Sequence, residues 1–250
     1  MRRVIVIKTI KPCMVLIIAL IIFIMGGFFV QDLSRLINLD RIRLVATFLS
    51  TVLVFTIRRN SLSRRDFVIL ILMYINVCIA DILFSIHKEY FGIIFFIVFQ
   101  FLYVLRLNVP LLSPLRLISL LSGTIIAFCS FFYNYSLNLM IAGYSIILIS
   151  SLIYAILNYK RSVLPLKNSK LLLYGIVLFF VSDITTGLNF KLSGLPYLIS
   201  SSITWMLYTP SLTLIALSGY RFAEPSEEIN SNGFQSCHNC NHNKMTGTYL

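Results

Sequence analysis

The sequence predicts an all-α protein of the membrane, a polytopic helical bundle with eight transmembrane helices. Of the 250 residues, 58% are hydrophobic and only 12% are charged. Apolar runs of roughly 20 residues, the length that crosses a bilayer, recur along the whole chain. Lys and Arg residues gather in alternate connections between these runs. A soluble globular domain carries about twice as many charged residues, so these observations exclude that class.

The apolar runs place the eight spans at roughly 12–30, 43–57, 67–86, 91–107, 115–133, 136–157, 171–190 and 196–219. A basic segment precedes the first run, as in a signal peptide, but no small-x-small cleavage site follows it. We therefore interpret the first run as a retained signal anchor. The fifth and sixth runs are separated by "FFYNYS", which predicts a tight turn.

The basic residues predict the orientation of the chain. With a cytoplasmic N-terminus, 16 of the 21 Lys and Arg residues fall on the cytoplasmic side, as the positive-inside rule requires. The net charge of +12 therefore reflects membrane topology and gives no reason to expect a nucleic-acid partner. We expect a multi-pass protein with both termini in the cytoplasm, located in the plasma membrane if the host is bacterial.

The integral domain is predicted to span residues 1–221, and residues 222–250 form a polar tail. The segment "EPSEEINSNG" has a composition typical of disorder. The tail also holds Cys237 and Cys240, with His238 and His242 beside them, and a C-x-x-C pair with nearby His residues can bind zinc. A solvated tail and a tail metal site are therefore both open.

A candidate internal repeat divides the integral domain into residues 3–105 and 106–221. Asp81 and Asp183 are 102 residues apart. The same offset relates Pro12 to Pro114, Gly92 to Gly194, and Arg58–Arg59 to Lys160–Arg161. Four spans in each half make the two repeats parallel, related by an axis near the membrane normal. The alternative is coincidence among membrane proteins of similar composition.

Asp81 and Asp183 are the candidate catalytic residues. Carboxyl groups within spans are costly and commonly mark a pathway or a reaction centre. Both lie a few residues before the outer end of their spans, at depths that differ by about 3 Å at 1.5 Å per residue. We expect the two carboxyls to face each other and to hold one proton between them, an arrangement suited to acid–base catalysis. Each could instead be a packing residue satisfied by a partner.

Polar residues on two other spans are candidate partners of these carboxyls. A stripe with helical spacing runs along the eighth span: Ser201, Thr204, Tyr208, Ser211 and Ser218. The fourth span carries Gln100 and Tyr103 on one face. Because a polar stripe facing lipid is costly, we expect both sets to face the bundle. Helix packing alone is the alternative role for the serines and threonines.

Five segments resemble the motifs of the YhhN-like lysoplasmalogenase family of eight-span membrane proteins. In chain order they are "KP" at Lys11–Pro12, "ADILF", "FGIIFFIVFQFLY", "GIVLFFVSDITTGLN" and "YTPSLTLIALS". The resemblance implies hydrolysis of the vinyl-ether bond of lysoplasmalogens to a fatty aldehyde and a glycerophospho-amine, without a metal or other cofactor. It implies catalysis by Asp81 and Asp183. Together with the polar residues described above, it gives five candidate substrate-binding residues: Gln100, Tyr103, Ser182, Tyr208 and Ser211.

The sequence departs from the family pattern at three positions. Ala80 replaces the Gly before the first Asp, Gln100 replaces a His, and Leu212 replaces a Gln. These departures favour an alternative function, that of an inactive lipid-binding protein or a small lipid or solute carrier. In both readings the partner is a membrane lipid or lysolipid, and a homodimer is compatible with both.

Overall fold

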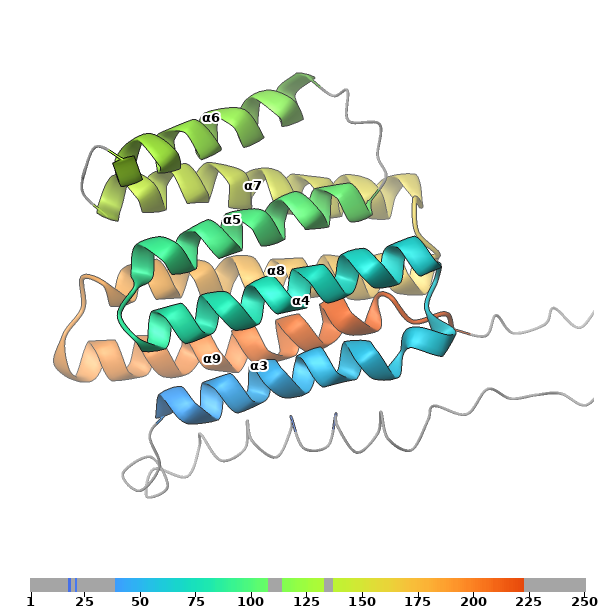
Figure 1. Cartoon of the computed structure of the whole chain (residues 1–250), viewed down its shortest axis with the longest axis horizontal. Helices are drawn as coiled ribbons and strands as arrows, with labels where there is room; N and C mark the ends of the chain where they lie inside the picture. Colours follow the sequence, from blue (N-terminus) through green and yellow to red (C-terminus); the bar gives the residue numbers. More distant parts are fainter. Residues whose placement is uncertain (1–17, 19–20, 22–38, 108–113, 133–136, 223–250) are drawn as a thin grey trace, which may run out of the picture. The chain divides into compact units, whose positions relative to one another are not determined.

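The computed structural model describes residues 18, 21, 39–107, 114–132 and 137–222 (Figure 1). Its long helices are α3 (Leu39–Thr56), α4 (Arg64–Ser85), α5 (Glu89–Arg106), α6 (Pro114–Phe132), α7 (Leu137–Arg161), α8 (Leu166–Asn189) and α9 (Gly194–Leu217). A short 3₁₀ helix, η1 (Arg58–Asn60), follows α3. The all-α prediction is confirmed for this part of the chain. The predicted first span and the tail with Cys237 and Cys240 lie outside the described residues.

Four of these helices, α4, α5, α7 and α8, are long and apolar enough to cross a membrane. Shorter apolar helices cover residues 44–56 and 118–132. Large apolar side chains are exposed on several helices, among them Phe48, Ile118 and Ile125. Extensive exposed apolar surface is unfavourable in water and suits contact with lipid. The helices therefore support a membrane-embedded protein, and the count of eight spans stays a prediction.

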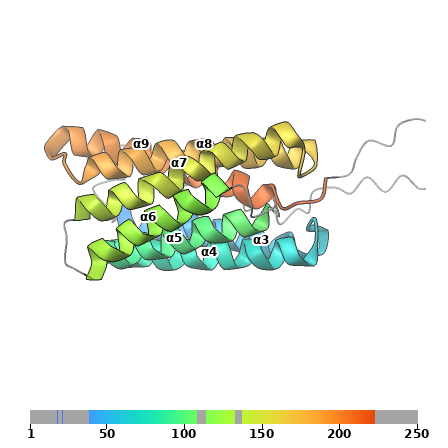
Figure 2. The ribbon, with the colours of Figure 1, turned by 90° about the horizontal axis from the view of Figure 1, so that it is seen from above.

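The helix contacts follow a pattern that repeats along the chain. Helix α3 packs on α4 as α7 packs on α8, and α4 packs on α5 as α8 packs on α9. Figure 2 shows the α4–α5 and α8–α9 neighbours. Helix α5 also contacts α7, as α9 contacts α3. The offset of 102 residues moves the start of α4 at Arg64 to the start of α8 at Leu166. A pseudo-twofold repeat requires such a pattern, although the repeat itself stays a prediction.

Small residues allow α6 and α7 to approach closely. A Cβ atom added at Gly123 would lie 2.7 Å from the carbonyl oxygen of Gly143, and one added at Gly143 would lie 2.7 Å from that of Gly123. These distances are too short for a real side chain. Membrane helices commonly pack through small residues because lipid supplies no hydrophobic drive for their association.

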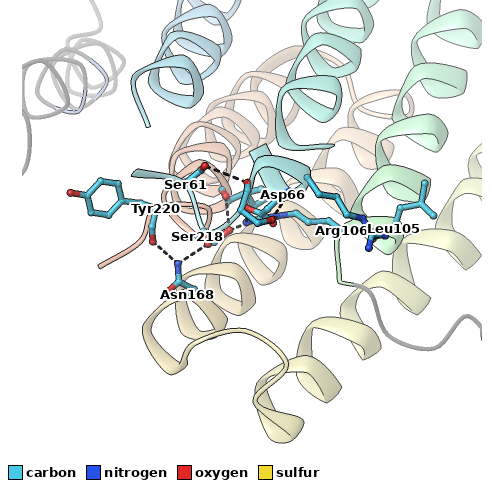
Figure 3. A network of polar contacts seen from close by, with 10 residues as sticks. Ser61, Asp66, Leu105, Arg106, Asn168, Ser218 and Tyr220 are labelled. Carbon is cyan, nitrogen blue, oxygen red and sulfur yellow. Dashed lines mark hydrogen bonds and ion pairs between the residues drawn. The ribbon is translucent and has the colours of Figure 1, made fainter. Parts of the chain in front are cut away.

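A buried polar cluster ties α4, α5, α8 and the end of α9 together (Figure 3). The Nε of Arg106 on α5 donates to Oδ1 of Asp66 on α4 at 2.8 Å, and its Nη1 donates to the Ser218 hydroxyl at 2.8 Å. Asn168 on α8 donates to the carbonyl oxygens of Ser218 and Tyr220 at 2.8 and 2.7 Å. The Asp66–Arg106 pair therefore fixes the last turn of α9 against two other helices.

The Arg106→Met variant tests how much this cluster contributes. Removing one partner of a buried ion pair leaves an uncompensated charge, so we expect the free energy of unfolding to fall by about 3 kcal/mol. Denaturant titration in detergent micelles measures this change. The matched control is Arg64→Met, since Arg64 lies on α4 two residues before Asp66 but is exposed. Equal stability of the two variants would show that the buried pair contributes nothing.

Candidate functional site

A cavity of about 300 Å³ contains both predicted carboxylates. Residues of α3, α4, α5, α7, α8 and α9 line it, together with His87 of the turn between α4 and α5. The polar lining residues are Asp81, Ser85, His87, Glu89, Tyr144, Asp183, Thr186, Asn189, Tyr197, Ser201, Thr204 and Tyr208. The structure thus brings two carboxyls 102 residues apart in sequence to one hollow in the bundle.

Asp81 is buried and is held by hydroxyl groups from two other helices. Thr47 on α3 donates to its Oδ2 atom at 2.6 Å. Tyr208 on α9 donates to its carboxyl oxygens at 3.1 Å. A buried carboxyl without such donors would lose the hydrogen bonds that water gives it, at a cost of several kcal/mol. Helices α3, α4 and α9 therefore meet at this side chain.

Asp183 occupies the corresponding place on α8. The Tyr144 hydroxyl on α7 donates to its Oδ2 atom at 2.5 Å. Asp183 is partly exposed, whereas Asp81 is buried. Both carboxyls line the same cavity. Each is thus hydrogen-bonded by the helix that precedes its own in the chain, α3 for Asp81 and α7 for Asp183.

Aromatic rings form much of the wall around the two carboxyls. The ring of Phe96 lies 6.3 Å from that of Tyr144, 5.9 Å from that of Phe179 and 6.5 Å from that of Tyr208, measured between centroids. Trp205 packs edge-on against Tyr208 at 5.1 Å. Such a wall lowers the local polarity, which strengthens the electrostatic interactions beside it.

Of the substrate-binding residues predicted from the sequence, Tyr208 lines the cavity and the other four do not. Ser211 donates to the carbonyl oxygen of Tyr208 in its own helix, at 2.6 Å. Ser182 donates to the carbonyl oxygen of Thr204 at 3.1 Å and joins α8 to α9. Tyr103 is fully buried on α5. A direct role of these residues in binding substrate stays a prediction.

Gln100 lies one layer behind the cavity. Its side chain is fully buried and does not line the cavity. Its amide makes no hydrogen bond of normal geometry with any residue that the structure describes. A buried amide without partners is costly. Gln100 is thus a buried polar residue whose role the contacts do not assign, at the place where the resemblance expects a His.

The sequence analysis missed Thr47, Tyr144 and Trp205. A weak signal existed for Tyr144, because it begins a stripe with seven-residue spacing that continues at Ser151 and Asn158, all buried on α7. Thr47 begins a similar stripe with Ser50 and Thr51, and Trp205 lies between Ser201 and Tyr208 of the stripe on the eighth span. Their contacts with Asp81 and Tyr208 depend on how α3 and α9 pack around the cavity.

Comparisons of the chain with protein-family models, with curated proteins and with solved structures find no match. The case for a function therefore depends on the cavity and on the motifs of the sequence.

The Tyr144–Asp183 hydrogen bond can be tested by a double-mutant cycle on stability. We expect Tyr144→Phe and Asp183→Asn to be non-additive, with a coupling free energy of about 1.5 kcal/mol, because a bond to a carboxylate is stronger than a neutral one. Denaturant unfolding of the two single variants and the double variant measures it. Tyr174→Phe serves as the matched control, since Tyr174 is on the same α8 and is 60% exposed. Additive effects of Tyr144→Phe and Asp183→Asn would contradict the assigned contact.

Proposed function

We propose that this chain is a lysoplasmalogenase-like hydrolase, which cleaves the vinyl-ether bond of a lysoplasmalogen to a fatty aldehyde and a glycerophospho-amine. The observation that carries the proposal is the convergence of three motif residues on one cavity. Asp81 comes from "ADILF", Asp183 from "GIVLFFVSDITTGLN" and Tyr208 from "YTPSLTLIALS". These segments are distant in the chain, and each contributes its polar residue to the same hollow.

Vinyl-ether hydrolysis suits a pair of carboxyls. A proton is delivered to the vinyl carbon remote from oxygen, and the resulting oxocarbenium ion is trapped by water. The hemiacetal that forms then releases the aldehyde and returns a proton to the oxygen of the departing glycerol. One acid, one base and a nearby negative charge are sufficient for these steps. The reaction consumes one water and needs no oxidant or reductant.

The surroundings of the two carboxyls give each a role in this proposal. Asp81 accepts hydrogen bonds from Thr47 and Tyr208, which fix the direction of its carboxyl oxygens. In this proposal Asp81 is the carboxylate that stabilises the cation and activates water. Asp183, which is partly exposed, supplies the proton, and Tyr144 orients its carboxyl.

The membrane arrangement in this proposal has eight spans, cytoplasmic termini and two parallel four-helix repeats. Both carboxyls then lie in the outer half of the membrane. A single-chain lipid can enter such a site sideways from the bilayer. The supporting observations are the apolar helices, the alternation of basic loops, and the repeated contact pattern of α3–α5 and α7–α9.

One observation favours the second candidate, a lipid-binding protein or carrier without turnover. Gln100 stands where the family has a His, and a carboxamide cannot exchange a proton near neutral pH. A tight complex with lysolipid, or lysolipid flux across a vesicle membrane, with no release of aldehyde would support this candidate. Efficient release of aldehyde would exclude it.

The aldehyde assay tests the proposal directly. Purified protein receives a lysoplasmalogen, and free aldehyde is measured over time. We expect Asp81→Asn and Asp183→Asn each to lower the rate at least about 100-fold, because each removes a proton-transferring or charge-stabilising group. The wild type must release aldehyde above a protein-free blank, and full activity of either variant would contradict the mechanism.

The matched control for this assay is Thr213→Val. Thr213 is buried on α9 but donates within its own helix, to the Thr209 carbonyl oxygen at 3.0 Å, and it does not line the cavity. We expect this variant to keep most of the wild-type rate. A large loss would show that the assay responds to any disturbance of α9.

A further inference from the structure

The cavity has a charge opposite to that of the chain. Three of the nine acidic residues line it, namely Asp81, Asp183 and Glu89. Among the residues that the structure describes, no Lys or Arg does so, although the chain has 21 of them. A concave site lined by one sign of charge with apolar walls concentrates ligands of the other sign. The lining therefore favours a ligand that carries a positive charge.

The three carboxyls lie at two depths. On α8, Asp183 precedes Asn189 by six residues, which is about 9 Å along the helix axis. On α9, Tyr197 precedes Tyr208 by eleven residues, or about 16 Å. Asp81 and Asp183 are thus at the inner part of the cavity with Tyr208. Glu89, at the first residue of α5, belongs to the mouth with Asn189 and Tyr197.

Glu89 is the carboxylate placed to meet a ligand cation. Asp81 and Asp183 already accept hydrogen bonds from buried hydroxyls, and those bonds are short. The Glu89 side chain is 30% exposed, and its carboxylate lies 3.9 Å from Nδ1 of His87, a pair that is ionic only when the His is protonated. A ligand ammonium can therefore approach Glu89 without displacing a structural hydrogen bond.

Aromatic rings surround the same part of the cavity. Phe190 and Tyr197 are 42% and 40% exposed at the mouth. Trp205 is half-buried and lies deeper, three residues before Tyr208 on α9. All three line the cavity. The faces of such rings attract ammonium groups, and aromatic surroundings with a nearby carboxylate are a common site for quaternary ammonium ligands.

We propose that the mouth of the cavity, formed by Glu89, Phe190 and Tyr197, binds the ammonium head of an amphiphile and selects ligands by that positive charge. The inference extends the proposed function to the head of its ligand and rests on it for the position of the reacting bond. With the head at the mouth, the part of the ligand about 9 Å deeper lies beside Asp183. The binding itself requires no hydrolysis.

A site that prefers an anionic head would use different residues. Lys88 and Lys191 are exposed at the turns beside the mouth but do not line the cavity. An anionic head would contact these lysines at the surface, whereas an ammonium head enters among the rings. Amphiphiles with the same chain and opposite heads therefore distinguish the two modes.

The chain contains one Trp, Trp205, which lines the inner part of the same cavity. Its fluorescence reports on occupation of the cavity. The full chain in a neutral maltoside detergent is titrated separately with decyltrimethylammonium and decyl sulfate. We expect a saturable fluorescence change with the ammonium amphiphile, and at least about tenfold weaker binding of the sulfate. Equal binding, or tighter binding of the sulfate, would overturn the inference.

Two variants then locate the head. We expect Glu89→Gln to raise the Kd of decyltrimethylammonium about three- to tenfold. The adjacent Lys88→Gln serves as the control and leaves that Kd unchanged. An unchanged Kd in Glu89→Gln would place the head elsewhere and overturn the assignment. Circular dichroism checks that Glu89→Gln is folded. The comparison of the ammonium and sulfate titrations uses wild-type protein only, so it does not depend on the folding of this variant.

A third ligand identifies the source of the ammonium group. Lysophosphatidylcholine carries the same head beyond a phosphate, and we expect it to bind in competition with decyltrimethylammonium. Binding of lysophosphatidylcholine alone would show that the positive charge is not sufficient and would overturn the inference. The aldehyde assay tests the proposed function separately. Selective ammonium binding without aldehyde release would contradict the hydrolase and leave the head assignment intact. Aldehyde release without charge selectivity would support the hydrolase and overturn the head assignment.

Discussion

The need to satisfy two carboxyl groups inside an apolar helical bundle governs the arrangement of the helices around the cavity. Neither Asp81 nor Asp183 can be accommodated by its own helix, because a helix backbone offers no free donors in its interior. The donors come from α3 and α9 for Asp81 and from α7 for Asp183. The close packing of these helices is thus coupled to the site, and a shift of any of them would expose an unpaired carboxyl.

The polar cluster at the opposite ends of α4, α5 and α8 supports that arrangement. It holds the last turn of α9 through Arg106, Asn168 and the Ser218 backbone. Tyr208 lies ten residues before Ser218 on this helix, about 15 Å away along the axis. Fixing one end of α9 limits sliding of the helix, and sliding would move the Tyr208 hydroxyl away from Asp81. The ion pair of Asp66 and Arg106 is therefore a positioning element for the site as well as a source of stability.

Periodicity and charge predict the all-α fold of the described residues. The second to eighth predicted runs correspond to α3–α9, because the length and polarity of an apolar helix are properties of consecutive residues. The repeat offset indicated that Asp81 and Asp183 belong together. The partners of the carboxyls were harder to predict, because Thr47 and Tyr144 lie on helices whose rotation depends on tertiary packing. The buried pair of Asp66 and Arg106 was also missed, since both residues stand at span ends where charged side chains normally face water.

In the proposed mechanism Asp81 and Asp183 act as one unit. The most direct test compares the rate of aldehyde release by the double variant Asp81→Asn/Asp183→Asn with the rates of the two single variants. Groups that act together in one step are strongly non-additive, since removing either one already abolishes the step. We expect the double variant to be about as slow as the slower single variant. A double variant slower by the product of the two single losses would contradict it, because the carboxyls would then contribute independently.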